Sequence, residues 1–141
     1  MVLRVFLTLL RLQRMISNLN VLIAGGRDFN DYDLLKSYAS AIINEMKCDT
    51  ITIVSGMARG ADLLGVKFAE ENKYQIKKFP AQWNKYGKMA GFIRNKQMLD
   101  YLANESDECI VIAFWDGKSK GTKHTIETAN TMNIKCFVHK Y

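Results

Sequence analysis

Short runs rich in β-branched residues alternate with longer stretches of helical periodicity from Asn20 onward. This alternation is typical of a βαβ protein, because strands that alternate with helices pair in parallel within one sheet. Strands are predicted at residues 21–24, 51–54, 75–79, 109–114 and 135–138. We therefore expect the α/β class: a Rossmann-like three-layer sandwich with a five-stranded parallel sheet of order 3-2-1-4-5 and helices on both faces.

Apolar residues at helical spacing lie between these strands and predict the helix faces that pack on the sheet. The predicted core-facing stripes comprise Leu34, Leu35, Tyr38, Ala41, Ile42 and Met46, then Ala61, Leu64 and Phe68, and then Phe92, Leu99 and Leu102. A last helix is predicted to begin with Thr122 as its cap. It should end near Met132, with Asn133 in the left-handed conformation that stops a helix.

The 141 residues suffice for one domain with one packed core, which we expect to span residues 18–141. Residues 1–17 form a basic, apolar leader with three arginines and no acidic residue. Its apolar core at residues 5–10 is too short for a membrane span or a signal peptide, so we expect no membrane partner. Two interpretations of the leader stay open: a start codon assigned upstream of the true one, or a short amphipathic helix.

The net charge of +6 is concentrated in a few segments. Between residues 73 and 99 seven cations occur without an Asp or Glu, and three more lysines lie at residues 118–123. Such segments suggest an anionic partner, with a solvated basic face as the alternative. The three cysteines form no CxxC pair, which favours buried reduced thiols and a cytoplasmic location. The two histidines have no second ligand at metal spacing, so we expect no metal site, and we expect no cofactor.

The placement of the glycines points to one edge of the sheet. Most of them follow predicted strands or lie in the third crossover: Gly25 and Gly26, Gly56 and Gly60, Gly87 and Gly91, Gly117 and Gly121. Since the loops that follow parallel strands all lie at the carboxyl edge, these glycines should converge there. Open α/β sheets bind ligands at this edge, and we expect the functional site there.

The loop after the first predicted strand has the features of an anion-binding turn. Gly25 and Gly26 permit close approach of a phosphate to the backbone. Arg27 offers a bidentate contact to the same phosphate, unless it pairs with Asp28 or Asp31 instead.

The loop after the second predicted strand leads directly into a helix. Ser55 supplies a hydroxyl, while Gly56 and Gly60 let the backbone curl so that amides of the helix start face an anion. Asp62 is expected to cap the helix, to pair with Arg59, or to contact a ribose hydroxyl. The segment lacks the lysine of a Walker loop, and no GxGxxG occurs, so hydrolysis of a nucleoside triphosphate is not supported.

Aromatic and cationic side chains are interleaved between residues 79 and 95. Trp83 and Tyr86 are candidates to stack on a base, or else to cover the sheet edge or a subunit contact. Arg94 and Asn95 follow about one turn into a helix, and we expect Arg94 to bind a phosphate.

The loop after the fourth predicted strand should face Arg27 across the crevice, since strands one and four flank the point where the strand order reverses. Lys118, Lys120 and the amides around Gly121 and Thr122 form a second candidate anion site, with solvated lysines as the alternative. Asp116 is the carboxylate nearest to this loop.

Four blocks together resemble the SLOG superfamily, the Rossmann-like group that contains the DNA-processing protein DprA (Smf) and the LOG nucleotide hydrolases. The blocks are GGRDF at residues 25–29, SGMARGAD at 55–62, PAQWNKYGKMAGFIRN at 80–95 and FWDGKSKGT at 114–122. Within the superfamily the pattern is most similar to the YspA-like branch, a domain of unknown function in bacteria and phages. The resemblance covers about residues 20–138. It implies a pocket for a nucleotide or a nucleotide derivative, lined by Gly25, Gly26, Arg27, Ser55, Gly56, Arg59, Arg94, Gly121 and Thr122.

The resemblance also allows the chemistry of LOG hydrolases to be compared. Their GGxGTxxE signature carries a glutamate that, with an arginine, assists cleavage of an N-glycosidic bond. Gly121 and Thr122 match this signature, but Thr125 stands where the glutamate would be. Glu127 lies two residues further along, which turns its side chain about 200° around the helix and away from the pocket. The hydrolase hypothesis therefore lacks its main catalyst.

Three functional hypotheses follow. The first is a small cytoplasmic SLOG-like domain that binds a nucleotide or nucleotide-derived ligand as a sensor or binder. The second is an N-glycosidase of nucleoside monophosphates, in which Asp116 or Asp62 stabilises the transition state and Arg94 holds the 5′-phosphate. The third is binding of single-stranded DNA, since SGMARGAD also resembles the corresponding block of DprA. By analogy with SLOG relatives, a homo-oligomer is also expected.

Overall fold

Five parallel strands form one sheet in the part of the chain that the computed structural model describes, namely residues 2–7, 17–105 and 108–141. Their order is β3-β2-β1-β4-β5, and every neighbouring pair is parallel. The strands are β1 (Asn18–Gly25), β2 (Thr50–Ser55), β3 (Gln75–Lys78), β4 (Glu108–Trp115) and β5 (Lys135–Lys140). The predicted α/β class and strand order are confirmed.

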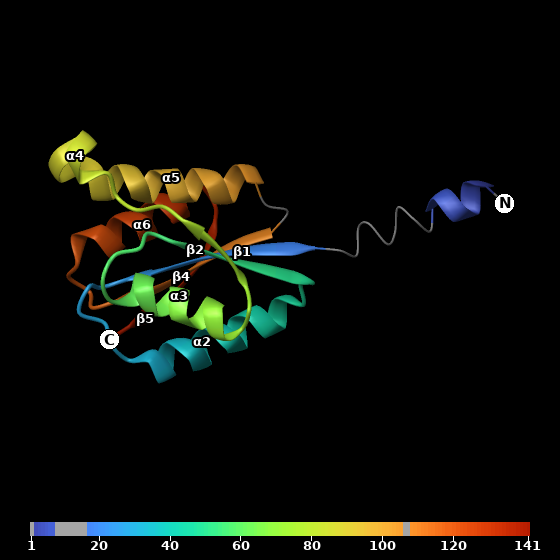
Figure 1. The fold of residues 1–141 in the computed structure, drawn as a ribbon, viewed down its shortest axis with the longest axis horizontal. Coiled ribbons are helices and arrows are strands. Elements are labelled where there is room, and N and C mark those ends of the chain that lie inside the picture. Colours follow the sequence, from blue (N-terminus) through green and yellow to red (C-terminus); the bar gives the residue numbers. More distant parts are fainter. Residues whose placement is uncertain (1, 8–16, 106–107) are drawn as a thin grey trace.

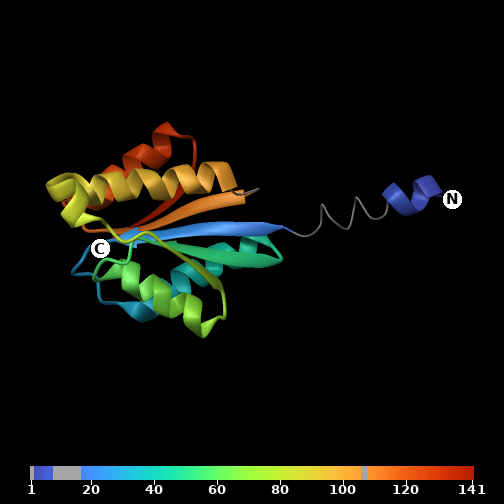
Figure 2. The same cartoon turned by 45° about the horizontal axis from the view of Figure 1, so that its top comes forward.

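Helices cover both faces of the sheet, as Figure 1 and Figure 2 show. One face carries α2 (Tyr32–Met46) and α3 (Ala61–Glu71), and the other carries α5 (Ala90–Glu105) and α6 (Lys120–Thr131). A short helix α4 (Trp83–Tyr86) and the 3-10 turn η1 (Gly87–Met89) precede α5 at the end of the molecule where the strands finish. This arrangement is the expected three-layer, Rossmann-like sandwich.

The central strand β1 is buried from Leu19 to Ala24 because both of its faces are covered. Val21 and Ile23 belong to the core shared with α2 and α3, whereas Leu22 belongs to the core shared with α5 and α6. The parallel register pairs Gly25 with Phe114, near the ends of β1 and β4. The loops that follow these two strands are therefore neighbours.

The observed strands extend beyond the predicted ones, except that β3 ends at Lys78, one residue before its predicted end. The strand β1 begins at Asn18 because Leu19 and Asn20 are already buried and paired with both neighbouring strands. The strand β5 continues to Lys140, which pairs with the last residue of β4. Sequence alternation at these ends was too weak to mark the bounds, since tertiary pairing sets them.

Two of the helix predictions are wrong in detail. Ser119 rather than Thr122 is the N-cap of α6, and Thr122 is buried in the first turn. Ala41, predicted to face the core, is exposed on α2. The predicted end of α6 is confirmed, because Met132 is its C-cap and Asn133 has a φ of 58°.

Residues 2–7 form a helix in which every residue is exposed. Residues 1 and 8–16, which make up most of the rest of the predicted leader, lie outside the described residues. In the described part of the chain, no helix is both long and apolar enough to cross a membrane. Cys48, Cys109 and Cys136 are free, and they are half-buried rather than buried as predicted.

Candidate functional site

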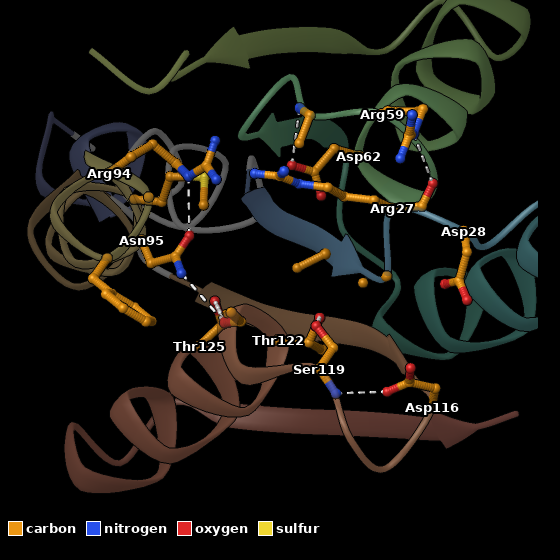
Figure 3. Close-up of a pocket in the computed structure, with 18 of the residues that line it drawn as sticks. Arg27, Asp28, Arg59, Asp62, Arg94, Asn95, Asp116, Ser119, Thr122 and Thr125 are labelled. Carbon is orange, nitrogen blue, oxygen red and sulfur yellow. Dashed lines mark hydrogen bonds between the residues drawn. The ribbon is translucent and has the colours of Figure 1, made fainter. Parts of the chain in front are cut away.

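A cavity of about 450 Å³ opens at the carboxyl edge of the sheet. Its walls come from four parts of the chain: the loop after β1, the loop after β2, the segment from α4 into α5, and the turn that leads into α6. Figure 3 shows charged side chains from these parts arranged around one space. The strand order explains the position, because β1 and β4 flank the point where the order reverses and a crevice forms.

The loop after β1 packs its backbone closely against β4. The amide of Gly26 donates to the carbonyl of Phe114 at 3.1 Å, and a Cβ at Gly25 would lie 3.1 Å from the Cβ of Phe114. Arg27 follows these two glycines and is exposed in the cavity wall. Its guanidinium carbon lies 5.8 Å from the centre of the Trp83 ring, within range of a cation–π contact.

The two alternative partners predicted for Arg27 are used elsewhere. Asp28 accepts a hydrogen bond from the hydroxyl of Tyr141 at 2.7 Å. Asp31 is the N-cap of α2 and accepts from the amide of Leu34 at 3.1 Å. Among the described residues Arg27 forms no ion pair. Its charge is therefore available to a ligand.

Ser55 and Gly60, expected among the ligand-binding residues, shape the loop after β2 and do not line the cavity. The Ser55 hydroxyl donates to the carbonyl of Asp62 and accepts from the amide of Met57, both at 3.1 Å. Gly60 has a φ of 88° and lies against the carbonyl of Gly26. A residue with a Cβ would be strained at Gly60. Ser55 and Gly60 therefore hold the conformation of the loop backbone.

Asp62 is buried beside Arg94 and is not paired with Arg59. Its Oδ2 accepts from the amide of Ala58 at 3.2 Å. Burial raises the pKa of Asp62 to about 6, although the charge of Arg94 and the Ala58 amide oppose this shift. Arg59 donates instead through Nε to the carbonyl of Arg27 at 3.3 Å and lines the cavity.

Arg94 and Asn95 connect the two halves of the site. The Arg94 guanidinium donates through Nη1 to the carbonyl of Gly56 and through Nε to Oδ1 of Asn95 at 3.0 Å. Asn95 donates in turn to the carbonyl of Gly121 at 3.3 Å, which ties α5 to the first turn of α6. Burial lowers the pKa of Arg94, and the Asp62 carboxylate opposes that shift. Gly56 does not line the first cavity but a second one beside it.

Asp116 closes the turn between β4 and α6. Its Oδ1 accepts from the amides of Ser119 at 2.7 Å and Lys118 at 2.8 Å, and these bonds lower its pKa. The Trp115 indole donates to the carbonyl of Ser119 at 3.0 Å and fixes the same turn. Asp116, Ser119 and Thr122 line the cavity, whereas Lys118 is exposed outside it. Lys118 therefore has the solvent-exposed position that was the alternative to a role in anion binding.

Residues 19–86 match the model of the family described as YspA, cpYpsA-related SLOG family. They include the loops after β1 and β2, which supply two walls of the cavity. Residues 19–86 belong to this SLOG family. Membership supports a nucleotide-related role in general.

Other comparisons add little to this membership. Among curated proteins, none matches the chain. A solved structure described as that of a predicted subunit of tRNA methyltransferase from Methanocaldococcus jannaschii has a similar arrangement, with a TM-score of 0.41 and 14% sequence identity. The match covers 87% of this chain and 67% of that chain.

The cavity is also lined by residues that the sequence did not mark as ligand contacts: Ala24, Ala58, Lys88, Phe92, Met98, Ser119 and Thr125. Gly91, expected at this edge with the other glycines, lines it as well. Phe92, predicted to face the core, lies with its ring 4.8 Å from that of His124 and is half-buried in the cavity wall. Thr125 stands three residues after Thr122, a spacing that places both on one helix face. This spacing was the signal that could have identified Thr125.

Glu127 points away from the cavity, as helical geometry predicted. It is exposed and forms an ion pair with Lys123 at 3.7 Å. Thr125 occupies the cavity wall instead and donates to the carbonyl of Gly121 at 3.3 Å. Within residues 2–7, 17–105 and 108–141, no three His, Cys, Asp or Glu residues are grouped to hold a metal ion.

Proposed function

We propose that this SLOG domain binds a nucleotide or a nucleotide-derived ligand in the cavity, as a sensor or a binding protein. The observation that carries the proposal is positive charge without a paired carboxylate. Arg27 and Arg59 are exposed in the cavity wall, and neither forms an ion pair among the described residues. Arg94 adds a third guanidinium, which lies beside the buried Asp62. Guanidinium groups bind phosphate through two parallel hydrogen bonds, so a phosphate is the anion that fits best.

The start of α6 supports the same ligand from the opposite wall. The first-turn amides of a helix have no carbonyl partner within it, and they lie at the positive end of its dipole. Gly121 and Thr122 belong to this first turn and line the cavity. The hydroxyls of Thr122 and Ser119 are hydrogen-bonded to each other at 3.4 Å, which leaves one of the two O–H groups as a further donor. A phosphate between α6 and the arginines would be bound on two sides.

Apolar side chains in the same cavity could pack against the base and the sugar of a nucleotide, which supports the proposal. Trp83, Phe92 and Met98 line it, and Trp83 is exposed over 49% of its surface. Aromatic rings that are open to solvent stack on bases whatever the base identity. A volume of about 450 Å³ is also within the range of small-molecule sites.

Isothermal titration calorimetry with the mono- and diphosphates of adenosine, guanosine, cytidine and uridine tests the proposal. We expect at least one of them to bind, and Arg27→Gln to weaken it at least tenfold, or about 1.4 kcal/mol. Lys36→Gln is the matched control, because Lys36 is exposed on α2 and lies 3.9 Å from Glu71. The proposal is contradicted if none of these nucleotides binds, or if the two variants lose the same amount of binding affinity.

The N-glycosidase hypothesis has one supporting feature, the raised pKa of Asp62, since a carboxyl that titrates at about 6 is suited to proton transfer. Chromatography of each nucleotide after incubation with the protein detects any free base. If base is released by the wild type and not by Asp62→Asn, the protein is an enzyme. Release that survives both Asp62→Asn and Asp116→Asn would exclude these two carboxylates as catalysts.

The salt dependence of the binding affinity distinguishes the DNA hypothesis from the nucleotide hypothesis. Binding of single-stranded DNA releases counterions, so its affinity falls steeply as ionic strength rises. A single nucleotide should instead show modest salt dependence and a clear base preference. Titration of an oligothymidine strand at two salt concentrations beside the preferred nucleotide distinguishes the two.

A further inference from the structure

Two cavities meet at the carboxyl edge of the sheet. The first lobe is the cavity of about 450 Å³ described above, and a second lobe of about 390 Å³ lies beside it over the loops that follow β2 and β3. Met57, Pro80 and Ala81 line the second lobe and not the first. Each volume alone is within the range of small-molecule sites. The edge therefore has room for a ligand that extends past the first lobe.

The wall shared by the two lobes is strongly cationic. Arg27, Arg59 and Arg94 line both lobes, together with Ala58 and Trp83. Figure 3 shows the three arginines on one side of the first lobe, across from Ser119 and Thr122. Burial lowers the pKa of Arg94, the Asp62 carboxylate opposes that shift, and the positive charge of Arg27 adds to it, so the Arg27 and Arg94 guanidiniums repel each other in part. An anion at the shared wall would relieve this repulsion.

The second lobe is more positive than the first. Asp28, Asp62 and Asp116 line the first lobe. Among the described residues that line the second lobe there is no Asp or Glu, and Asp62, the carboxylate that acts on Arg94, lines the first lobe instead. A second anionic group, beyond the one at the shared wall, is therefore favoured in this lobe.

The backbone of the second lobe is held in an unusual conformation. Met57 has a φ of 61°, in the left-handed region that residues other than glycine rarely adopt. Its amide donates to the Ser55 hydroxyl at 3.1 Å, and the next amide, that of Ala58, donates to Asp62 at 3.2 Å. Such conformations cluster at ligand sites, where neighbouring groups hold them in place.

We infer that the ligand is a nucleoside diphosphate rather than a monophosphate. Its nucleoside lies in the first lobe, its α-phosphate lies at the shared arginines, and its β-phosphate enters the second lobe. The inference rests on the proposed function and specifies the ligand class of that site.

Calorimetric titration of the whole protein with each nucleoside monophosphate and its diphosphate tests the inference, in the wild type and in two variants of Ala81. Ala81→Glu places a carboxylate in the second lobe, and Ala81→Gln is its uncharged control of the same size. For the preferred base we expect the wild type to bind the diphosphate at least fivefold more tightly than the monophosphate. Ala81→Glu should remove most of this difference, whereas Ala81→Gln should keep it.

The outcomes separate the two proposals. If the monophosphate binds and the affinity for the diphosphate is less than fivefold higher, the nucleotide site stands and the inference is overturned. If Ala81→Glu and Ala81→Gln reduce the diphosphate preference equally, a shape change explains the loss and the inference fails as well. If none of the nucleotides binds the wild type, both proposals are overturned.

Discussion

At the scale of single residues, Arg94 depends on the absence of a side chain at Gly56. A Cβ at Gly56 would lie 2.6 Å from Nη1 and 2.8 Å from Cζ of Arg94. Gly56→Ala should therefore displace the guanidinium from the Gly56 carbonyl and leave buried polar groups unpaired, at a cost of about 1 to 3 kcal/mol. Urea denaturation measures this loss of unfolding free energy.

Gly121→Ala is the comparison for this prediction. A Cβ at Gly121 would meet no atom within 4 Å, and the residue lies in the first turn of α6. Alanine is the better helix former, so this variant should be as stable as the wild type or gain up to about 1 kcal/mol. Equal destabilisation by the two substitutions would show that the contact between Gly56 and Arg94 is not specific.

The buried carboxyl of Asp62 predicts a pH-dependent stability. Because burial raises its pKa from 3.8 to about 6, the folded protein keeps a proton that the unfolded chain loses first. Stability should thus fall as pH rises from about 4 to about 6, by about 3 kcal/mol for such a shift. Asp62→Asn cannot titrate. Urea denaturation from pH 4 to pH 7 should show the wild type losing stability relative to this variant, and parallel pH profiles would refute the assignment.

The residues of the site were predictable to different degrees. Gly25, Gly26 and Arg27 could be placed, because adjacent glycines and a cation after a strand define a turn at the carboxyl edge. The contacts of Asp62 and Arg94 could not be predicted from the sequence, because Arg94 binds the Gly56 carbonyl, which lies 38 residues away in the chain. No local pattern records such a contact, and only the packing of α5 against the loop after β2 creates it.

At the scale of secondary-structure elements, α4 forms a cavity wall through Trp83. The Trp83 ring is exposed over 49% of its surface, whereas the indole N–H of Trp115 is bonded to Ser119. Acrylamide should therefore quench mainly Trp83. A bound nucleotide that stacks on this ring should reduce quenching in the wild type, and Trp83→Phe should remove the effect. An unchanged quenching slope at saturating nucleotide would exclude Trp83 from the site.

The hydrophobic periodicity of the sequence predicted the order and type of the long elements. It did not predict the short elements. Alternation of β-branched runs with helical stretches was sufficient for β1 to β5, since buried parallel strands are short and apolar. The helix α4 and the turn η1 have four and three residues, too few for any periodicity. The start of α6 was misplaced because Thr122 is a good cap in isolation, but the Asp116 turn fixes Ser119 at that position.

At the scale of the whole molecule, the strand order creates the site. The sheet order β3-β2-β1-β4-β5 places the loops of β1 and β4 together, and it places the loops of β2 and β3 beside them. Positive side chains from the first two loops and from α5 gather at this edge. Of the cations in the two predicted basic segments, all of them among the described residues, only Lys88 and Arg94 line the cavities, whereas Arg27 and Arg59 come from outside those segments and Lys118 lies outside the cavity.

The most direct test of nucleotide binding at this edge is an amide chemical-shift map of the isotope-labelled protein, recorded with and without a saturating nucleoside diphosphate. We predict shifts at Gly25, Gly26, Gly121 and Thr122, because their backbones lie in the cavity wall. Ala41 on the exposed side of α2 should not move. Shifts confined to other surfaces, or none for any of the four bases, would contradict the account.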